Sequence, residues 1–254
     1  YAGSGQTRFG DAFIRGVDFL LEAQYANGGW PQFYPLRRGY YEHITYNDGA
    51  MIGVMSLLRD IAEQTSPYEF VDPERRDKAR TAIAKGLEIV LKTQVKVDGM
   101  LTAWCAQHDR ETLEPALARS YELPSISGGE SAGIIRYLMS IENPDERIIR
   151  AVVSAIDWYE RSKIIGKALI RNPDPDLPRG YDRIIVDDLD APPLWGRFYQ
   201  IETNRPIFVG RDGVIKYSLA EIEHERRVGY SYARSYGTGI LNEFPAWKTK
   251  WVSE

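Results

Sequence analysis

The sequence predicts a mainly α-helical protein in which pairs of long helices are arranged around a ring and long irregular loops form the cleft. Three observations predict this architecture: segments with a helical hydrophobic period, a repeat of these segments, and polar, aromatic stretches between them. The 254 residues, 43% of them hydrophobic, suffice for the core of one large domain or of two small ones, and we expect one catalytic domain over residues 1–254. A mixed domain of helices and loops without closed symmetry is the alternative.

The repeat begins at a glycine and ends at a glutamine, at residues 16–24 and again 70 residues later at 86–94. A weaker third copy follows after another 65 residues, at 151–159. In each copy the apolar residues return at the spacing of one helix face, and a glycine turn and a tryptophan follow the first two. We therefore expect a long helix at each copy.

Two further helices lie between the copies, at residues 49–62 and 129–141, where apolar residues again follow a helical period. Helix starts are indicated by Asp72-Pro73-Glu74 and by Asn143-Pro144-Asp145-Glu146, each interpreted as a capping residue followed by proline in the first turn.

Composition excludes several classes of protein. A net charge of −4 argues against a nucleic-acid partner, and no run of eighteen apolar residues suggests a membrane span. Cys105 is the only cysteine, so no intrachain disulfide can form. The motifs of nucleotide-binding loops, zinc sites and serine nucleophile elbows are absent from the sequence.

The predicted loops at 27–48 and 98–128 hold the first candidate residues. Asp48 lies just before a predicted helix, where it is either an N-cap or a carboxylate that binds a cation at the mouth of the cleft. Arg119 lies between Pro115 and Pro124, outside any helix interior, and a structural ion pair with Glu122 or Glu130 is one interpretation of it.

The third predicted loop, 171–213, contains three arginines within fifteen residues, interleaved with Trp, Phe and Tyr: Arg197, Arg205 and Arg211. Guanidinium groups bind carboxylates through paired hydrogen bonds, and the neighbouring rings either support a sugar or fix the loop. This segment predicts an acidic ligand.

Taken together, several motifs resemble the family 10 polysaccharide lyases, which are pectate lyases. They are GGWP (28–31), TYNDGAM (45–51), ARSYELPS (118–125), SGGES (127–131), APPLWGRFY (191–199), RDG (211–213) and ERR (225–227). The resemblance runs in order from about Phe13 to Trp247, nearly the whole chain.

The resemblance implies an (α/α)₃ toroid that cleaves α-1,4-polygalacturonate by calcium-assisted anti β-elimination with an arginine base. It places the base at Arg119 and carboxylate clamps at Arg197 and Arg211, with Arg183 and Arg136 in reserve. A free guanidinium has a pKa above roughly 12, so only a small neutral fraction would be available as a base.

The cation and sugar contacts that the resemblance implies are less closely defined. Asp48 is the first choice for calcium and a member of the catalytic group, with Asp109 and Glu42 as weaker candidates. The predicted substrate-binding residues besides the clamps are Arg205, Asn47, Trp30, Tyr46 and Trp195, although core packing is the commoner fate of tryptophan.

Two other functions stay open at this point: a glycoside hydrolase with a carboxylate pair, and a non-catalytic polyuronate-binding module. The arginine-rich loop argues against the hydrolase, because it favours an anionic substrate. We expect polygalacturonate as the partner, a monomeric protein and secretion, with the periplasm as the other possible location.

Overall fold

The computed structural model describes residues 5–252. They form two compact units, and the chain passes between them more than once. Unit 1 comprises the chain up to Thr93 together with His108–Glu114, and unit 2 comprises Gln94–Gln107 and the chain from Pro115 onward. The expectation of one catalytic domain over 1–254 stays a prediction.

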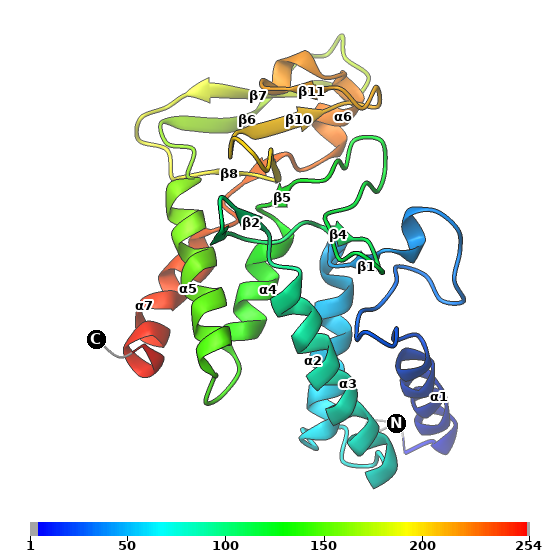
Figure 1. Ribbon diagram of the computed structural model, residues 1–254. Helices are drawn as coiled ribbons and strands as arrows, with labels where there is room; N and C mark the ends of the chain where they lie inside the picture. The colour runs from blue at the N-terminus through cyan, green and yellow to red at the C-terminus, as the bar shows by residue number, and fades with distance from the viewer. Residues whose placement is uncertain (1–4, 253–254) are drawn as a thin grey trace. The chain divides into compact units, whose positions relative to one another are not determined.

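Unit 1 is built on the helices α1 (Thr7–Glu22), α2 (Ala50–Ala62) and α3 (Pro73–Lys92) (Figure 1). Short elements join α1 to α2: the 3₁₀ turn η1 (Tyr40–Glu42), strand β1 (Ile44–Thr45) and the 3₁₀ turn η2 (Asn47–Gly49). Met55 and Leu58 of α2 are fully buried. Gly86 of α3 allows a close approach, since a Cβ there would lie 3.0 Å from both the Met55 sulfur and a ring carbon of Trp30.

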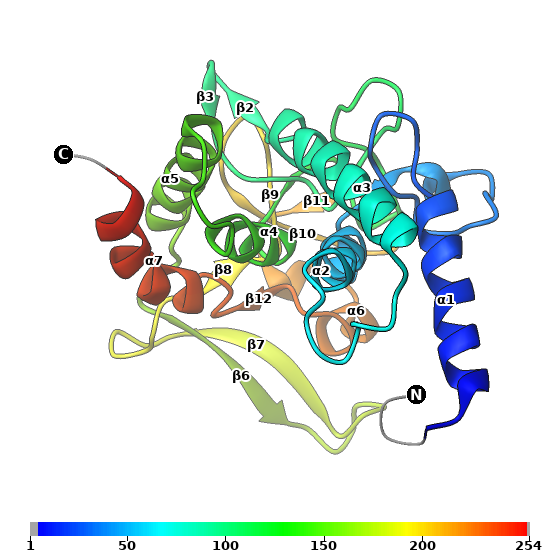
Figure 2. The same ribbon diagram turned by 90° about the horizontal axis from the view of Figure 1, so that it is seen from below.

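Unit 2 contains α4 (Glu130–Met139), α5 (Glu146–Arg161), the short α6 (His224–Gly229) and α7 (Thr238–Trp251). The helices α4, α5 and α7 contact one another, and Figure 2 shows them as one group. The largest buried rings between these elements belong to Trp104, Trp158 and Trp195.

Antiparallel strands make up much of the remainder of unit 2. The longest pair is β6 (Lys167–Pro173) with β7 (Tyr181–Asp187), and a four-stranded sheet has the order β11-β10-β9-β5 (Figure 1). The 3₁₀ turn η3 follows these strands at Leu219–Glu221. The other strands are β2 (Lys96–Val97), β3 (Met100–Leu101), β4 (Gln107–His108), β5 (Ile126–Ser127), β8 (Trp195–Gly196), β9 (Phe198–Tyr199), β10 (Pro206–Val209), β11 (Ile215–Lys216) and β12 (Ala233–Arg234).

The repeated glutamine gives the sequence repeat a structural meaning. The side-chain amide of Gln24 donates to the carbonyls of Gly28 and Ala82, each at 2.9 Å. That of Gln94 donates in the same way to Thr102 and Ala151, also at 2.9 Å. In each of these two copies the amide therefore joins the segment that follows its own helix to the helix of the next copy.

The prediction of a closed (α/α)₃ toroid is wrong. Over residues 5–252 the chain has seven α-helices together with antiparallel sheets, and no closed barrel forms. All five long helices predicted from the hydrophobic period exist, but α1–α3 belong to unit 1 and α4 and α5 to unit 2. Residues 171–213, predicted as irregular loop, instead supply strands, and two of these strands, β8 and β9, pair with partners distant in the sequence.

The two predicted helix starts have different outcomes. Asp72 is the N-cap of α3, its carboxylate accepts from the Arg75 amide at 3.0 Å, and Pro73 occupies the first turn, as predicted. The N-cap of α5 is Asp145, which accepts from the amides of Arg147 and Ile148 at 2.9 Å. The proposed cap at Asn143 is wrong, because Pro144 precedes the helix and Asp145 is the residue that meets the free amides.

In residues 5–252 no helix combines the length and the apolar composition that crossing a lipid bilayer requires.

Replacing the cap of α3 tests how far local interactions stabilise unit 1. Asp72→Ala removes the acceptor for the Arg75 amide, so we expect the free energy of unfolding to fall by about 1 kcal/mol. Chemical denaturation followed by far-ultraviolet circular dichroism measures the change. The control is Asp77→Ala, since Asp77 lies within the same helix and its carboxylate pairs with the exposed Arg80. An equal loss in both variants would contradict the capping role.

Candidate active site

A buried carboxylate, Glu122, is the centre of the polar site in unit 2. Its side chain accepts hydrogen bonds from Arg119 Nε at 2.8 Å and Nη2 at 2.7 Å, in a turn closed by the Glu122 amide and the Arg119 carbonyl. Glu122 is only 4% exposed. Burial by itself would raise the pKa of Glu122, but the hydrogen bonds from Arg119 and Tyr230 outweigh it and lower that pKa. The structural ion pair with Glu122, one interpretation from the sequence, is therefore confirmed.

Tyr230 connects this pair to the rest of the site. Its hydroxyl donates to Glu122 Oε1 at 2.7 Å, and its ring contacts Tyr121 edge-on at a centroid distance of 5.4 Å. The Arg197 guanidinium lies 4.8 Å from the centre of the Tyr230 ring. Burial raises the pKa of Tyr230 well above its usual range, so this phenol stays protonated and acts as a donor.

Arg197, between β8 and β9, lies against the Tyr230 ring and pairs with Glu130 at the start of α4. Its Nη2 donates to Glu130 Oε1 at 2.5 Å, and both side chains are almost fully buried. Glu130 also accepts a short hydrogen bond from Ser127. The buried pair holds Arg197 in place against the aromatic ring.

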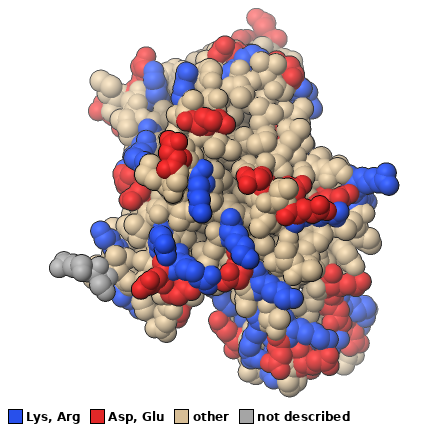
Figure 3. Space-filling model, viewed as in Figure 1, with Lys and Arg blue, Asp and Glu red and all other residues tan. Residues whose placement is uncertain are grey.

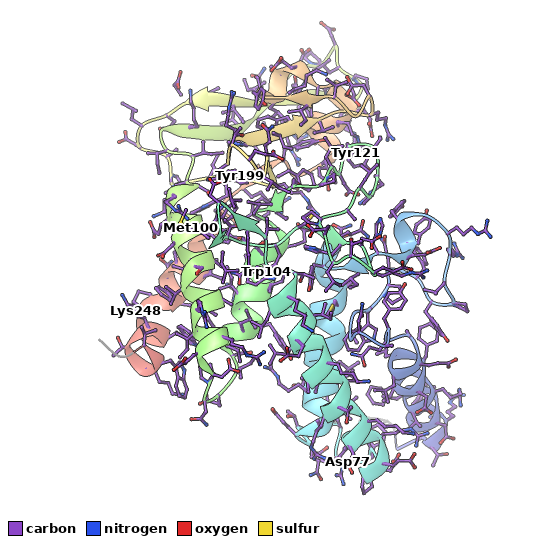
Figure 4. The ribbon with its side chains drawn as sticks, viewed as in Figure 1. Asp77, Met100, Trp104, Tyr121, Tyr199 and Lys248 are labelled. Carbon is purple, nitrogen blue, oxygen red and sulfur yellow. The ribbon has the colours of Figure 1, made fainter. Side chains whose placement is uncertain are left out.

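The ring of Tyr121, which is labelled in Figure 4, lies close to three guanidinium groups. Its ring centre lies 5.3 Å from the guanidinium of Arg119, 4.7 Å from that of Arg226 and 6.0 Å from that of Arg211. Arg211 and Arg226 share the carboxylate of Glu225, and their hydrogen bonds lower the pKa of Glu225 to about 2. We call this group the arginine cluster: Arg119, Arg197, Arg211 and Arg226 around Tyr121 and Tyr230.

One more guanidinium reaches the cluster. Arg183, on β7, donates through Nη1 to the Tyr230 carbonyl at 3.3 Å. Within residues 5–252 it forms no ion pair with a carboxylate. By contrast, the hydrogen bonds to Glu122 raise the pKa of Arg119 above its usual range. The two guanidinium groups therefore differ in their surroundings. The carboxylate of Glu122 favours the charged form of Arg119, whereas the partner of Arg183 is a neutral carbonyl.

The structure therefore brings together Arg119, Arg197 and Arg211, as the sequence grouped them, and leaves Arg205 apart from them. Arg205 stacks on Tyr217 at 3.7 Å. Tyr230 is the residue that the sequence did not indicate, because it lies outside every motif and acts through its position in the fold. Arg136, held in reserve for the arginine group, forms a surface pair with Glu243 at 2.9 Å.

The predicted aromatic platform is not available in this structure. Trp30, Tyr46 and Trp195 are at most 3% exposed. The indole nitrogens of Trp30 and Trp195 donate to backbone carbonyls, and the Tyr46 hydroxyl bonds to Thr93. All three are core residues, which is the alternative that the sequence left open for the tryptophans.

The carboxylates predicted to bind calcium all lie in unit 1. Asp48 is exposed and has a left-handed backbone, with φ of 54°, beside the buried Asn47. The N-cap of α2 is Gly49, and no side chain caps that helix, so the capping interpretation of Asp48 is wrong. A non-glycine residue in this conformation is uncommon, although aspartate tolerates it better than most.

The two weaker calcium candidates have partners of their own. Asp109 accepts from the amides of Glu111 and Thr112, which lower its pKa, and Glu42 pairs with Arg110 at 3.3 Å. In the described part of the chain no three His, Cys, Asp or Glu side chains come together as a metal site. The described carboxylates therefore form no complete calcium cage.

Comparison with known proteins points to one family. The family profile described as "Pectic acid lyase" matches residues 1–241. A solved structure of a family 10 polysaccharide lyase from Cellvibrio cellulosa is 36% identical, with a TM-score of 0.88 over 97% of this chain and 75% of that one. A mutant of the Cellvibrio cellulosa lyase, solved with trigalacturonic acid, is 35% identical, with a TM-score of 0.87 over 100% and 77%. No curated protein matches the chain.

The buried pair at the centre of the site gives a prediction for stability and its dependence on pH. Glu122→Gln replaces the carboxylate that neutralises Arg119 with an amide. We therefore expect the free energy of unfolding to fall by about 1–3 kcal/mol at neutral pH. The folded pKa of Glu122 lies below its usual 4.5. Its contribution is therefore complete above about pH 4.5 and is lost as the pH falls through the folded value.

Urea denaturation of the wild type and of Glu122→Gln at about pH 7 and about pH 3 measures this difference. We expect it to be large at neutral pH and to shrink at acid pH. Glu243→Gln is the control, because Glu243 forms an exposed pair with Arg136, and such pairs contribute about 0–1 kcal/mol. A difference that did not change with pH would show that Glu122 acts through packing and not through its charge.

Proposed function

Because the chain belongs to the pectic acid lyase family and is a polysaccharide lyase, we propose that it cleaves α-1,4-polygalacturonate by β-elimination. The observation that carries the proposal is the arginine cluster, which concentrates guanidinium groups in a chain of net charge −4. A lyase is neither the hydrolase nor the binding module that the sequence left open. The trigalacturonic acid bound by the mutant Cellvibrio enzyme supports a polyuronate substrate.

In this reaction a base removes the proton from C5 of a galacturonate, beside its carboxylate, and the electron pair forms a C4–C5 double bond. The bond from C4 to the glycosidic oxygen breaks, on the opposite face of the ring, and that oxygen leaves with the neighbouring sugar. Negative charge develops on the carboxylate during proton removal, so fixed cations beside it lower the barrier. The products are two shorter chains, one of which ends in a 4,5-unsaturated uronate.

The arginine cluster supports carboxylate binding. Arg211 and Arg119 keep part of their side chains exposed, and each is held by a glutamate, so their guanidinium groups are fixed before substrate arrives. Substrate binding then costs little side-chain ordering. We assign Arg119 and Arg211 to the binding of uronate carboxylates, with Arg197 positioned behind them by Glu130.

The base must lose a proton, and the surroundings of the arginines favour Arg183 for this role over Arg119. Glu122 raises the pKa of Arg119 and so opposes formation of its neutral form. The partner of Arg183 is the Tyr230 carbonyl. A neutral guanidine retains N–H donors, so this hydrogen bond survives deprotonation, whereas an ion pair with a carboxylate does not.

Calcium is part of the proposal, and Asp48 is the residue that we assign to it. When bound, the ion would join carboxylate oxygens of protein and substrate, the ligands that calcium prefers. Because the described carboxylates of this chain form no complete cage, substrate carboxylates would have to supply the remaining ligands. Asp48 contributes an exposed carboxylate, and its left-handed backbone forms part of the turn that precedes α2.

The proposal extends to location and assembly. A polymer of this size is met outside the cell, and oligomers also reach the periplasm, so we propose an extracellular or periplasmic enzyme. We further propose that it acts as a monomer, since the arginine cluster is built within one unit of one chain.

The first test of the function is product formation. With polygalacturonate, calcium and alkaline buffer, we expect absorbance in the ultraviolet band of a conjugated 4,5-unsaturated uronate to rise. A chelator should abolish the rise and added calcium should restore it. New reducing ends without that absorbance would replace elimination by hydrolysis, and activity unaffected by the chelator would remove calcium from the proposal.

The second test separates the base from the clamps. Arg183→Ala should lower kcat by about 10²–10⁴-fold, the range for a lost general base, with a smaller change in KM. Arg119→Ala should act mainly through KM, because it removes a carboxylate contact. Arg136→Ala, which removes a surface arginine of unit 2, is the matched control and should change neither constant. If Arg119→Ala abolishes turnover and Arg183→Ala does not, the base role returns to Arg119.

A further inference from the structure

A second basic site lies in unit 2, outside the arginine cluster. It is a hollow of about 390 Å³ between the β2–β3 hairpin and one face of α5. Its lining includes Lys96, Met100 and Leu101 of the hairpin and Arg150, Asp157 and Arg161 of the helix. The volume is within the range of small-molecule sites.

The charges of this hollow are unbalanced. Lys96 and Arg150 form no ion pair or side-chain hydrogen bond with any other residue in 5–252. Among the described residues Arg161 donates a single hydrogen bond from its guanidinium, from Nε to the Asp157 backbone carbonyl at 3.2 Å. Asp157 is the one acidic side chain among the lining residues. In a chain of net charge −4, three cations facing one carboxylate form a local anion-binding surface.

The walls of the hollow are fixed by the fold. Arg150, Asp157 and Arg161 recur at the spacing of one helix face, while the opposite face of α5 is buried. The hairpin turns at Asp98 and Gly99, both with positive φ, as two-residue hairpins prefer. Gln94 holds the two walls together, because its amide donates to Thr102 beside β3 and to Ala151 in α5. The hollow is therefore preformed.

The hollow also offers an apolar surface. Met100, labelled in Figure 4, is 57% exposed at the end of the hairpin, and Leu101 follows it. Figure 3 shows basic side chains on the visible face over the region where α5 and the β2–β3 hairpin lie in Figure 1. Carboxylates and the apolar faces of sugar rings are the two chemical features of a galacturonate, and the two surfaces match them.

From these observations we propose that the hollow is a second polyuronate-binding site, in which Lys96, Arg150 and Arg161 bind galacturonate carboxylates and Met100 contacts a sugar ring. The choice of galacturonate as its ligand rests on the function proposed above. A chain long enough to occupy both sites is bound more tightly than by either alone, because the second contact is intramolecular. Short oligomers do not gain this advantage.

The test is a double variant, Lys96→Ala with Arg150→Ala, titrated calorimetrically with trigalacturonic acid in the presence of a chelator, which suppresses turnover. Both side chains are exposed, so the variant keeps its fold, which circular dichroism verifies. We expect it to bind one trimer fewer per chain than the wild type. In the turnover assay its KM for long polygalacturonate should rise about tenfold while its constants for trigalacturonate stay unchanged.

Two controls define the outcome. Lys248→Ala with Lys250→Ala removes the same charge from α7, where Lys248 is labelled in Figure 4, and should leave binding and KM unchanged. Asp157→Asn removes the carboxylate of the hollow and should strengthen trimer binding several-fold. If the Lys96/Arg150 variant binds as many trimers as the wild type, the inference is overturned. If the wild type gives no unsaturated product but the difference in binding persists, the proposed function fails and the second site stands.

Discussion

The polar site of unit 2 depends on the burial of one charge, the carboxylate of Glu122. Removing a carboxylate from water is costly unless its oxygens are fully hydrogen bonded, and here Arg119 and Tyr230 supply the donors. Because the Tyr230 hydroxyl is directed to Glu122, its ring and carbonyl have fixed positions. The ring then supports Arg197, and the carbonyl accepts from Arg183.

Each cation of the arginine cluster has a counter-charge before any substrate binds. Arg119 pairs with Glu122, and Arg197 pairs with Glu130. Arg211 and Arg226 both pair with Glu225. These contacts lower the repulsion between guanidinium groups that share two aromatic rings. The hydrogen bonds of Arg119 to Glu122 also raise the pKa of Arg119, which favours the charged form of that guanidinium.

The repeated glutamine is a second constraint, because it links one helix of the repeat to the helix of the next copy. In the first two copies of the repeat, one glutamine amide donates to two carbonyls, one in the segment that follows its own helix and one in the helix of the next copy. A side-chain amide has two donors, and both are used. In unit 2 the same contact also positions the β2–β3 hairpin against α5, which gives the second basic hollow its shape.

By itself the sequence determined the five long helices, the capping of α3 and the membership of Arg119, Arg197 and Arg211 in one group. These follow from local periodicity, local hydrogen bonding and motif resemblance. Only the tertiary structure decided that the helices divide between two units without a closed ring. It also decided the sheet of unit 2, in which β5 and β9 pair residues about seventy apart in the chain. It also decided that Trp30 and Trp195 are core residues, and that Tyr230 organises the site. Burial and the pairing of charges depend on which distant segments meet, and no local pattern records that.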